Sequence, residues 1–446
     1  MRNGNSTKSK LLALSFAALM GVQAASAQTE TAPSVANADS TAARLDQVEE
    51  RLSILGKKMK PWGALSISGY VQVEAKYEQS KDEIAFNVRR GRVKTSYSNE
   101  WGAAVLQLDV TEKGVGIKDA YLMAKIPKFD YIMLQGGVFD RPFGYEISYS
   151  SSKRETMERS RIFRTLFPNE RDLGAKLRFT GKKGSALGNF WLDAGIFCGN
   201  GIAAEKSSTY GDMDKDFISH FGYSQKFKNW SAGAGLSYYY GNVYAGDYII
   251  GQDPVTKADI IQDATVKRWD DNAGTWATAE GKQAHRQYFG VDAQFEFKTI
   301  IGKTKIFGEF LIGTQPGLAS SSTSHSGDGY FDDEAKFSGG DEAYDIYERN
   351  FMGGYVYLTQ SIVNDKNTLV FKYDNYDPNY KVSGVDCTNE GDIMYHTFSV
   401  GYIYSPISNL RLMAQMDFVW NEITALKGYT YNKPDNVVTL RVQYKF

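Results

Sequence analysis

The sequence predicts an all-β protein, a 16-stranded antiparallel transmembrane β-barrel with a short N-terminal periplasmic helix. Three observations lead to this fold class. Apolar and polar residues alternate along many short segments, long and short connections follow one another regularly, and the chain starts like a secreted protein. Aromatic residues make up 14% of the 446 residues, with 29 Tyr and 43 Gly, a mixture that suits strands and turns better than helices.

Residues 1–27 have the pattern of a secretory signal peptide. Two lysines precede a short apolar stretch at 11–20, and Ala25-Ser26-Ala27 forms an A-x-A cleavage site. We therefore expect the chain to be exported, and the sequence contains 2 Cys, too few for a disulfide framework. The sequence leaves open whether Cys198 and Cys387 are bonded.

Residues 28–60 are predicted to form a linker and a short coiled-coil helix. The first part of this range is rich in small and polar residues. The second part has apolar residues at spacings of 3, 4, 3 and 4, namely Leu45, Val48, Leu52, Leu55 and Met59. This is the a/d pattern of a coiled coil, sustained for about two heptads. Two interpretations remain open: a helix that lies against the barrel or is unstructured, or a small periplasmic coiled coil that joins three protomers.

The barrel is predicted to occupy residues 61–446, where the apolar period changes to 2. In the last segment Val438, Leu440 and Val442 alternate with Thr439 and Arg441, so one face meets an apolar medium and the other meets water. Most segments have the roughly 9–11 residues that a tilted strand needs to cross a bilayer. The sixteen predicted strands are 64–78, 84–98, 102–112, 117–127, 130–140, 171–181, 189–199, 216–227, 230–241, 285–298, 303–312, 347–362, 367–377, 392–404, 409–421 and 436–446.

The connections between these strands provide an independent test of the barrel. If the first strand runs outward, every long connection falls on the outer side, although the outer connections 79–83 and 113–116 are also short. The long connections are 141–170, 200–215, 242–284, 313–346, 378–391 and 422–435. Short periplasmic turns and long outer loops are typical of barrels in the bacterial outer membrane. We therefore expect this location, with membrane lipid and lipopolysaccharide as partners.

Aromatic residues mark the expected periplasmic interface. Trp62, Trp101 and Trp230 flank periplasmic turns or the start of the barrel, and amphipathic rings prefer the level of the lipid headgroups. The last residue, Phe446, closes an alternating strand. A terminal Phe in this position resembles the signal that the barrel assembly machinery of the outer membrane reads, which implies that machinery as a partner.

Basic residues with inward parity gather in the first six strands. They are Arg90, Arg92 and Lys94 in strand 84–98, about 7 Å apart by strand rise, and Lys176 and Arg178 in strand 171–181. Inward-facing acids are also present, namely Glu74, Asp109, Asp292, Glu296, Glu309, Asp374 and Asp417. One interpretation is that the basic residues only balance these acids. The other is that basic residues on the first six strands and acids on strands ten to fifteen create an electric field across the pore, which draws anions to one wall.

The long connection 141–170 is the candidate constriction. It carries the basic residues Arg141, Lys153, Arg154, Arg159, Arg161 and Arg164, and the apolar residues Ile162, Phe163, Leu166 and Phe167. A loop in water gains nothing from apolar side chains, so we expect it to fold into the lumen. There its basic residues are expected to pair with the acids of strands ten to fifteen, and Lys153, Arg154 and Arg159 to line the eyelet near Arg90 and Arg92. The alternative is an ordinary outer loop whose charges contact lipopolysaccharide or water.

Several motifs resemble those of the phosphate-selective porin O and P family. The segment 86–93 is similar to its F-x-x-R-R-x-R pattern, and parts of 141–174 resemble its constriction loop in order and spacing. The resemblance implies a trimeric, 16-stranded, anion-preferring porin. It also implies that Arg89, Arg90 and Arg92 belong to an arginine ladder and that Lys153 is a lysine of the constriction loop. Beyond strand six, no further run of inward arginines follows.

These features lead us to expect passive diffusion of small hydrophilic solutes, with small anions preferred and phosphate among the candidates. The alternative is a surface adhesin or antigen whose loops 242–284 and 313–346 bind a partner, with little channel activity. We expect no enzyme activity, cofactor or metal, because the four His residues lie far apart and no G-x-S-x-G motif occurs. A net charge of -1 gives no reason to expect nucleic acid as a partner.

Overall fold

The computed structural model describes residues 64–182, 184–199, 201–202, 215–245, 247–252, 254–324, 345–362 and 366–446. The expected signal peptide (1–27), the linker with its coiled-coil helix (28–60) and Trp62 lie outside the described residues. Within the described residues, no helix is both long enough and apolar enough to span a membrane.

The wall of the barrel consists of sixteen antiparallel strands, each paired with the next, and the last strand pairs with the first to close it. All sixteen predicted strands are present, so the predicted fold class is confirmed. The strands are β1 (Leu65–Glu78), β2 (Glu83–Ser98), β3 (Gly102–Thr111), β4 (Gly114–Ile126), β5 (Phe129–Asp140), β6 (Arg171–Thr180), β7 (Phe190–Phe197), β8 (Asp216–Lys226), β9 (Trp230–Tyr244), β14 (Gln283–Thr299), β15 (Gly302–Gly317), β16 (Ile346–Ile362), β17 (Asn367–Asp377), β18 (Tyr395–Ile407), β19 (Leu410–Asn421) and β20 (Val437–Lys445).

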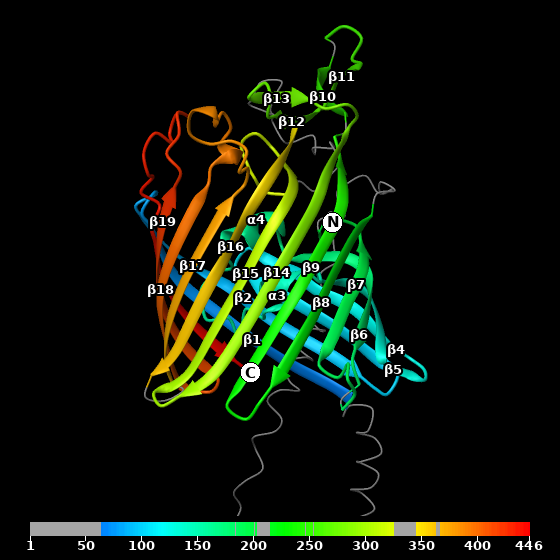
Figure 1. Ribbon diagram of the computed structural model, residues 1–446, viewed down its shortest axis with the longest axis vertical. Coiled ribbons are helices and arrows are strands. Elements are labelled where there is room, and N and C mark those ends of the chain that lie inside the picture. The colour runs from blue at the N-terminus through cyan, green and yellow to red at the C-terminus, as the bar shows by residue number, and fades with distance from the viewer. Residues whose placement is uncertain are drawn as a thin grey trace, which may run out of the picture. The chain divides into compact units, whose positions relative to one another are not determined.

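The two ends of the barrel differ as the connection lengths predicted (Figure 1). Short turns such as 227–229 and 408–409 lie at one end, which we name the turn end, and long connections lie at the other, the loop end. The connection between β9 and β14 was predicted as a loop, but it contains four short strands: β10 (Asp247–Gln252), β11 (Asp259–Asp263), β12 (Val266–Asp270) and β13 (Thr275–Thr278). They form two hairpins, and β12 also pairs in parallel with β16.

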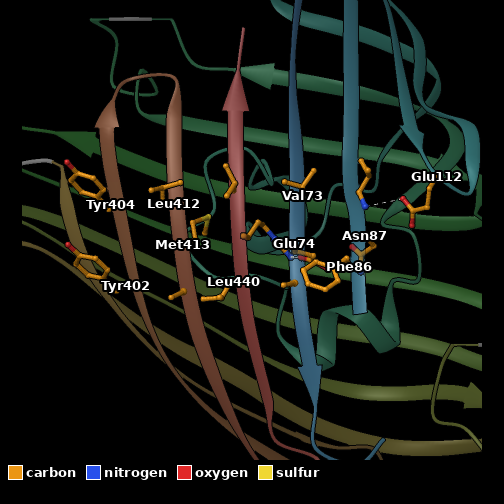
Figure 2. A pocket seen from close by; sticks show the side chains of 15 residues that line it. Val73, Glu74, Phe86, Asn87, Glu112, Tyr402, Tyr404, Leu412, Met413 and Leu440 are labelled. Carbon is orange, nitrogen blue, oxygen red and sulfur yellow. Dashed lines mark hydrogen bonds and ion pairs between the residues drawn. The ribbon is translucent and has the colours of Figure 1, made fainter. Parts of the chain in front are cut away.

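The outer face of the wall is apolar. On β1, Ile67, Val71 and Val73 are 62%, 42% and 44% exposed, whereas the intervening Gln72 is buried on the inner side. Figure 2 shows part of this face, a groove of about 960 Å³ lined mainly by apolar side chains of β18, β19, β20, β1 and β2. Exposed apolar side chains in such numbers would be costly in water but are stable against lipid acyl chains. The barrel therefore has the surface of a membrane-spanning protein.

The C-terminus closes the barrel at the turn end. Phe446 and Gly69 exchange two backbone hydrogen bonds of 3.0 Å, which extend the pairing of β20 with β1. A Cβ atom at position 69 would lie 2.5 Å from the Phe446 ring, so only glycine leaves room for that ring. Other turns at this end of the barrel carry exposed Trp101 and a stacked pair, Phe227 and Trp230, with ring centroids 3.9 Å apart.

The chain between β5 and β6, residues 141–170, lies within the barrel and contains the short helices α3 (Gly144–Ser148) and α4 (Arg161–Leu166) (Figure 1). We name these residues the inner segment. Its apolar side chains Ile162, Phe163, Leu166 and Phe167 are at most 1% exposed. They pack against rings that the inner face of the wall contributes, including Tyr239, Tyr288 and Phe351. An apolar core therefore fills part of the lumen, on the side of β9, β14 and β16.

Candidate functional site, the lumen at the inner segment

The first helix of the inner segment is fixed by a carboxylate of the wall. Glu309 on β15 accepts hydrogen bonds from the backbone N–H groups of Tyr145 and Glu146, at 2.8 and 2.6 Å, and from the Tyr355 hydroxyl at 2.5 Å. These N–H groups belong to the first turn of α3 and have no partner within the helix. Glu309, which the sequence predicted to face the lumen, thus accepts hydrogen bonds from backbone N–H groups of the inner segment.

The middle of the inner segment crosses to the opposite wall. The Ser151 hydroxyl hydrogen-bonds Tyr70 of β1 at 2.6 Å and accepts from Arg92 of β2 at 3.0 Å. Arg441 of β20 donates to the carbonyl of Met157 at 2.7 Å. These contacts, with those of Glu309, join strands on both sides of the barrel through the inner segment and narrow the lumen between them.

Glu158 is the centre of a cluster of arginines. Arg89 forms a bidentate pair with it, at 2.7 and 2.8 Å, and Arg441 donates to it at 2.9 Å. Arg90 and Arg154 approach to 3.6 and 3.9 Å. Burial raises the pKa of Glu158, but the surrounding arginines, Arg90 and Arg89 foremost, outweigh burial and hold the pKa well below its usual value. Glu158 is therefore ionised.

A β-bulge explains how two consecutive arginines reach the same carboxylate. Gln72 of β1 pairs with Arg90, but the next residue, Val73, pairs with Val88, so Arg89 has no pairing partner. In strict alternation Arg89 and Arg90 would point to opposite faces, and one would meet lipid. The extra residue re-aims Arg89 so that both side chains bind Glu158.

The cluster contains more basic groups than acids. Arg92 pairs with Asp109 at 3.2 Å and Arg441 with Glu74 at 2.5 Å. Five guanidinium groups (Arg89, Arg90, Arg92, Arg154 and Arg441) thus face three carboxylates (Glu74, Asp109 and Glu158). The two buried atoms Arg90 Nε and Arg154 Nη1 have no hydrogen-bond acceptor. The net charge of these groups is positive, because an arginine stays protonated in almost any protein environment.

The remaining predicted site residues occupy several environments. Arg159 is buried, pairs with Glu170 and donates to the carbonyl of Glu146 at 2.8 Å. Lys176 and Arg178 both pair with Asp193 of β7, at 3.4 and 2.5 Å. The side chain of Lys176 is 4% exposed, and that of Arg178 is 41% exposed. Lys94 is half-buried and Lys153 is exposed.

The ion pairs of the inner segment differ from the expected ones. Its basic residues were expected to pair with acids of strands ten to fifteen, but Arg141, Arg154 and Arg159 pair with the nearer acids Asp172, Glu158 and Glu170, respectively. The pair that crosses to β15 has the opposite polarity, since Glu155 accepts from Lys305 at 2.7 Å. Glu309, one of the wall acids expected to pair with an arginine, accepts hydrogen bonds from backbone N–H groups instead. A count of charges in the sequence does not predict this role.

A second buried network holds the two ends of the inner segment. Arg141 lies 3.3 Å from Asp172, which also accepts from the backbone N–H of Gly199 at 2.9 Å. Beside them, Asp216 pairs with Arg286 at 2.6 Å and accepts from the Tyr239 hydroxyl at 2.5 Å. Sequence reasoning did not single out Arg286 and Asp216, because each occurs alone in its strand with no neighbouring motif.

Among the residues that the structure describes, no group of three or more His, Cys, Asp or Glu side chains has the geometry of a metal site. His220 contacts Asp292 at 2.8 Å within the wall, and His285 contacts Glu348 at 3.0 Å. His325 lies outside the described residues. Cys198 and Cys387, both in the described part of the chain, do not form a disulfide with each other.

Comparison with solved structures supports the fold. An anion-selective porin from Comamonas acidovorans superposes with a TM-score of 0.50 at 11% identity, covering 86% of this chain and 99% of the other. OprB of Pseudomonas putida (TM-score 0.46, 11% identity, 90% and 97% covered) and OmpF of Salmonella typhi (0.49, 9%, 86% and 97%) are also similar. No family model matches the sequence, and no curated protein matches it.

The chain has the fold of an outer-membrane porin. At 11% identity the likeness carries the fold alone. The closed barrel, its apolar outer face and its segregated connections place this porin-like protein in the bacterial outer membrane. The specific resemblance to the phosphate-selective porin O and P family rests on the motifs in the sequence.

Proposed function

We propose that the protein is a porin that allows small hydrophilic solutes to diffuse passively through the barrel, with a preference for anions. The observation that carries this proposal is the arginine cluster around Glu158, where five guanidinium groups face three carboxylates in the narrowed part of the lumen. A fixed positive surplus at a constriction lowers the electrostatic barrier for anions and raises it for cations.

Two groups of predicted site residues contribute in different ways. Arg89, Arg178, Lys94 and Lys153 keep exposed surface, and we assign them direct contact with passing ions. The buried residues Arg90, Arg92, Arg154, Arg159 and Lys176 act through their field, and the four arginines also hold the inner segment in place. Phosphate is one of the anions that such a cluster suits, because guanidinium groups bind phosphate oxygens in a bidentate manner.

The experiment is a solute-uptake assay in proteoliposomes together with conductance recordings in planar bilayers. We expect discrete, stable conductance steps and swelling of the liposomes in small neutral sugars. Protein that inserts, migrates as a folded barrel on gels and yet leaves the bilayer silent would contradict a porin and favour the surface adhesin. Phosphate selectivity is tested separately, by competition of phosphate with chloride current.

A further inference from the structure

A second lumenal feature lies between the inner segment and the turn end of the barrel. It is a cavity of about 770 Å³, lined by residues 145–153 of the inner segment, by the connection 184–189 and by the ends of β8, β9, β14 and β15. The wall residues that line it, such as Gln294 and Glu296, share inward parity with Asp292, which lies on the lumenal side. We name it the turn-end chamber. Its volume lies in the range of pockets that hold small ligands.

One side of the turn-end chamber is aromatic. Tyr145 and Tyr149 stack with ring centroids 5.1 Å apart, and Phe307 of β15 contacts both rings, at 5.2 and 5.9 Å. The two tyrosines are only half-buried and line the chamber, so part of each ring faces it. Ring faces and edges bind other planar, apolar groups. They add nothing to the binding of a compact inorganic ion.

The chamber is also basic. Its lining includes the ammonium groups of Lys153, Lys226 and Lys305 and one carboxylate, that of Glu296. Glu296 pairs with Lys303, and Lys305 pairs with Glu155, so the positive surplus of the lining comes from Lys153 and Lys226. The other lining groups include amides and hydroxyls, which donate and accept hydrogen bonds. A ligand that satisfies this lining has a planar apolar part and a negative charge.

We propose that the turn-end chamber binds aromatic carboxylates as they pass through the pore. The proposal rests on the proposed porin function and names the class of solute that the lumen favours. A benzoate-like ring packs beside Tyr145 and Tyr149, and its carboxylate lies near Lys153 and Lys226. Aliphatic and inorganic anions share only the second interaction, so they bind more weakly.

The test compares three anions of equal charge in planar bilayers that contain the full protein: benzoate, cyclohexanecarboxylate and acetate. We expect benzoate to reduce the chloride current at the lowest concentration. Tyr145→Ala should raise the concentration of benzoate needed for half-block by about three- to tenfold and leave the value for acetate unchanged. The hydrogen bond from Tyr145 to Glu309 uses the backbone N–H, so this variant keeps it. Lys153→Gln should weaken both benzoate and acetate.

Two matched variants control for general effects. Tyr240→Ala removes an exposed ring on the outer face of β9, and Lys427→Gln removes a charge from the connection between β19 and β20 at the loop end. Both should leave the benzoate block unchanged. Equal half-blocking concentrations for the three anions, or an unchanged value in Tyr145→Ala, would overturn the proposal. If the bilayer shows no current, the porin function fails, and calorimetric titration of the detergent-solubilised protein tests the binding site separately. Tighter binding of benzoate than of cyclohexanecarboxylate supports the site, and equal binding overturns it.

Discussion

At the scale of single residues, strand parity alone does not decide which charged side chains face the lumen; local backbone irregularities and ion pairs also decide it. Arg89 would face lipid in regular alternation, and the bulge at this position turns it toward Glu158 instead. The same carboxylate also binds Arg441, which lies more than 280 positions away in the chain. Glu158 therefore reduces the positive charge of the narrow part of the lumen, together with Glu74 and Asp109.

The role of Glu158 can be tested by removing its charge. Glu158→Gln keeps the shape of the side chain but deletes one of the three carboxylates of the cluster, so the positive surplus increases and anion preference should rise. Arg89→Gln should lower it. The measurement is the ratio of chloride to potassium permeability, with Lys427→Gln as a control at the loop end. A fall in anion preference in Glu158→Gln together with a rise in Arg89→Gln, or no change in either variant, would show that the cluster does not govern ion preference.

Cys387 provides a test of how tightly the connection between β17 and β18 is packed. This thiol is 2% exposed and packs with Val382, Ile393 and Tyr429. Burial, with smaller effects of nearby acids, raises the pKa of the Cys387 thiol to about 12. The reactive thiolate is therefore scarce below that pH and becomes abundant only as the pH rises toward it.

In a Cys198→Ser variant, alkylation of Cys387 by iodoacetamide at pH 8 should be at least about a hundredfold slower in the folded protein than in the denatured protein. Mass spectrometry of the intact chain follows the reaction. Equal rates in the folded and denatured states would mean that this connection is open to solvent.

At the scale of elements, the inner segment is the part to which the proposed function assigns selectivity. Helix α3 is fixed at Glu309, the middle of the segment at β1, β2 and β20, and the ends at Asp172. Each anchor is a hydrogen bond or ion pair to a different strand, so no single contact holds the segment alone.

Deleting 148–160 and joining the ends with a short Gly-Ser linker should widen the lumen and remove the charged residues Lys153, Arg154, Glu155, Glu158 and Arg159. We expect single-channel conductance to rise and anion preference to fall together, because both depend on this narrow part of the lumen. A deletion of 254–258, in the turn between β10 and β11, is the matched control and should change neither quantity. Unchanged conductance after the first deletion would mean that ions pass elsewhere.

The elements also show how much of the fold could be predicted from the sequence. The period of 2 predicted all sixteen strands, since one face of every strand meets lipid and that constraint is local. The four apolar side chains from Ile162 to Phe167 predicted a buried segment for the same reason. The hairpins β10–β13, the bulge at Arg89 and the partners Asp193 and Arg286 were not predicted. They depend on pairing across the barrel, which no local pattern encodes.

At the scale of the whole molecule, the barrel presents an apolar outer face that can contact either lipid or a further copy of itself. The resemblance to the phosphate-selective porin O and P family implies a homotrimer. We expect the full-length protein to migrate as a heat-sensitive trimer on mild detergent gels. Deleting 28–60 should weaken the trimer without abolishing it if this range forms a coiled coil, and should leave it unchanged if the range lies against the barrel.

Native mass spectrometry of both forms checks the oligomeric state independently of gel migration. A monodisperse monomer of the intact protein would contradict the trimer. This result would leave the channel function of a single barrel unaffected, because strands of the same chain supply the contacts that hold the inner segment.

The central claim, an anion-preferring channel through the narrowed lumen, is tested most directly by the zero-current potential of the intact protein in a potassium chloride gradient. The uncompensated guanidinium groups around Glu158 predict a potential with the sign of chloride selectivity. The preference should weaken as salt rises, since screening shortens the reach of the charges to about 3 Å at 1 M. A potential of the opposite sign, or one that stays at zero at low salt, would contradict the account.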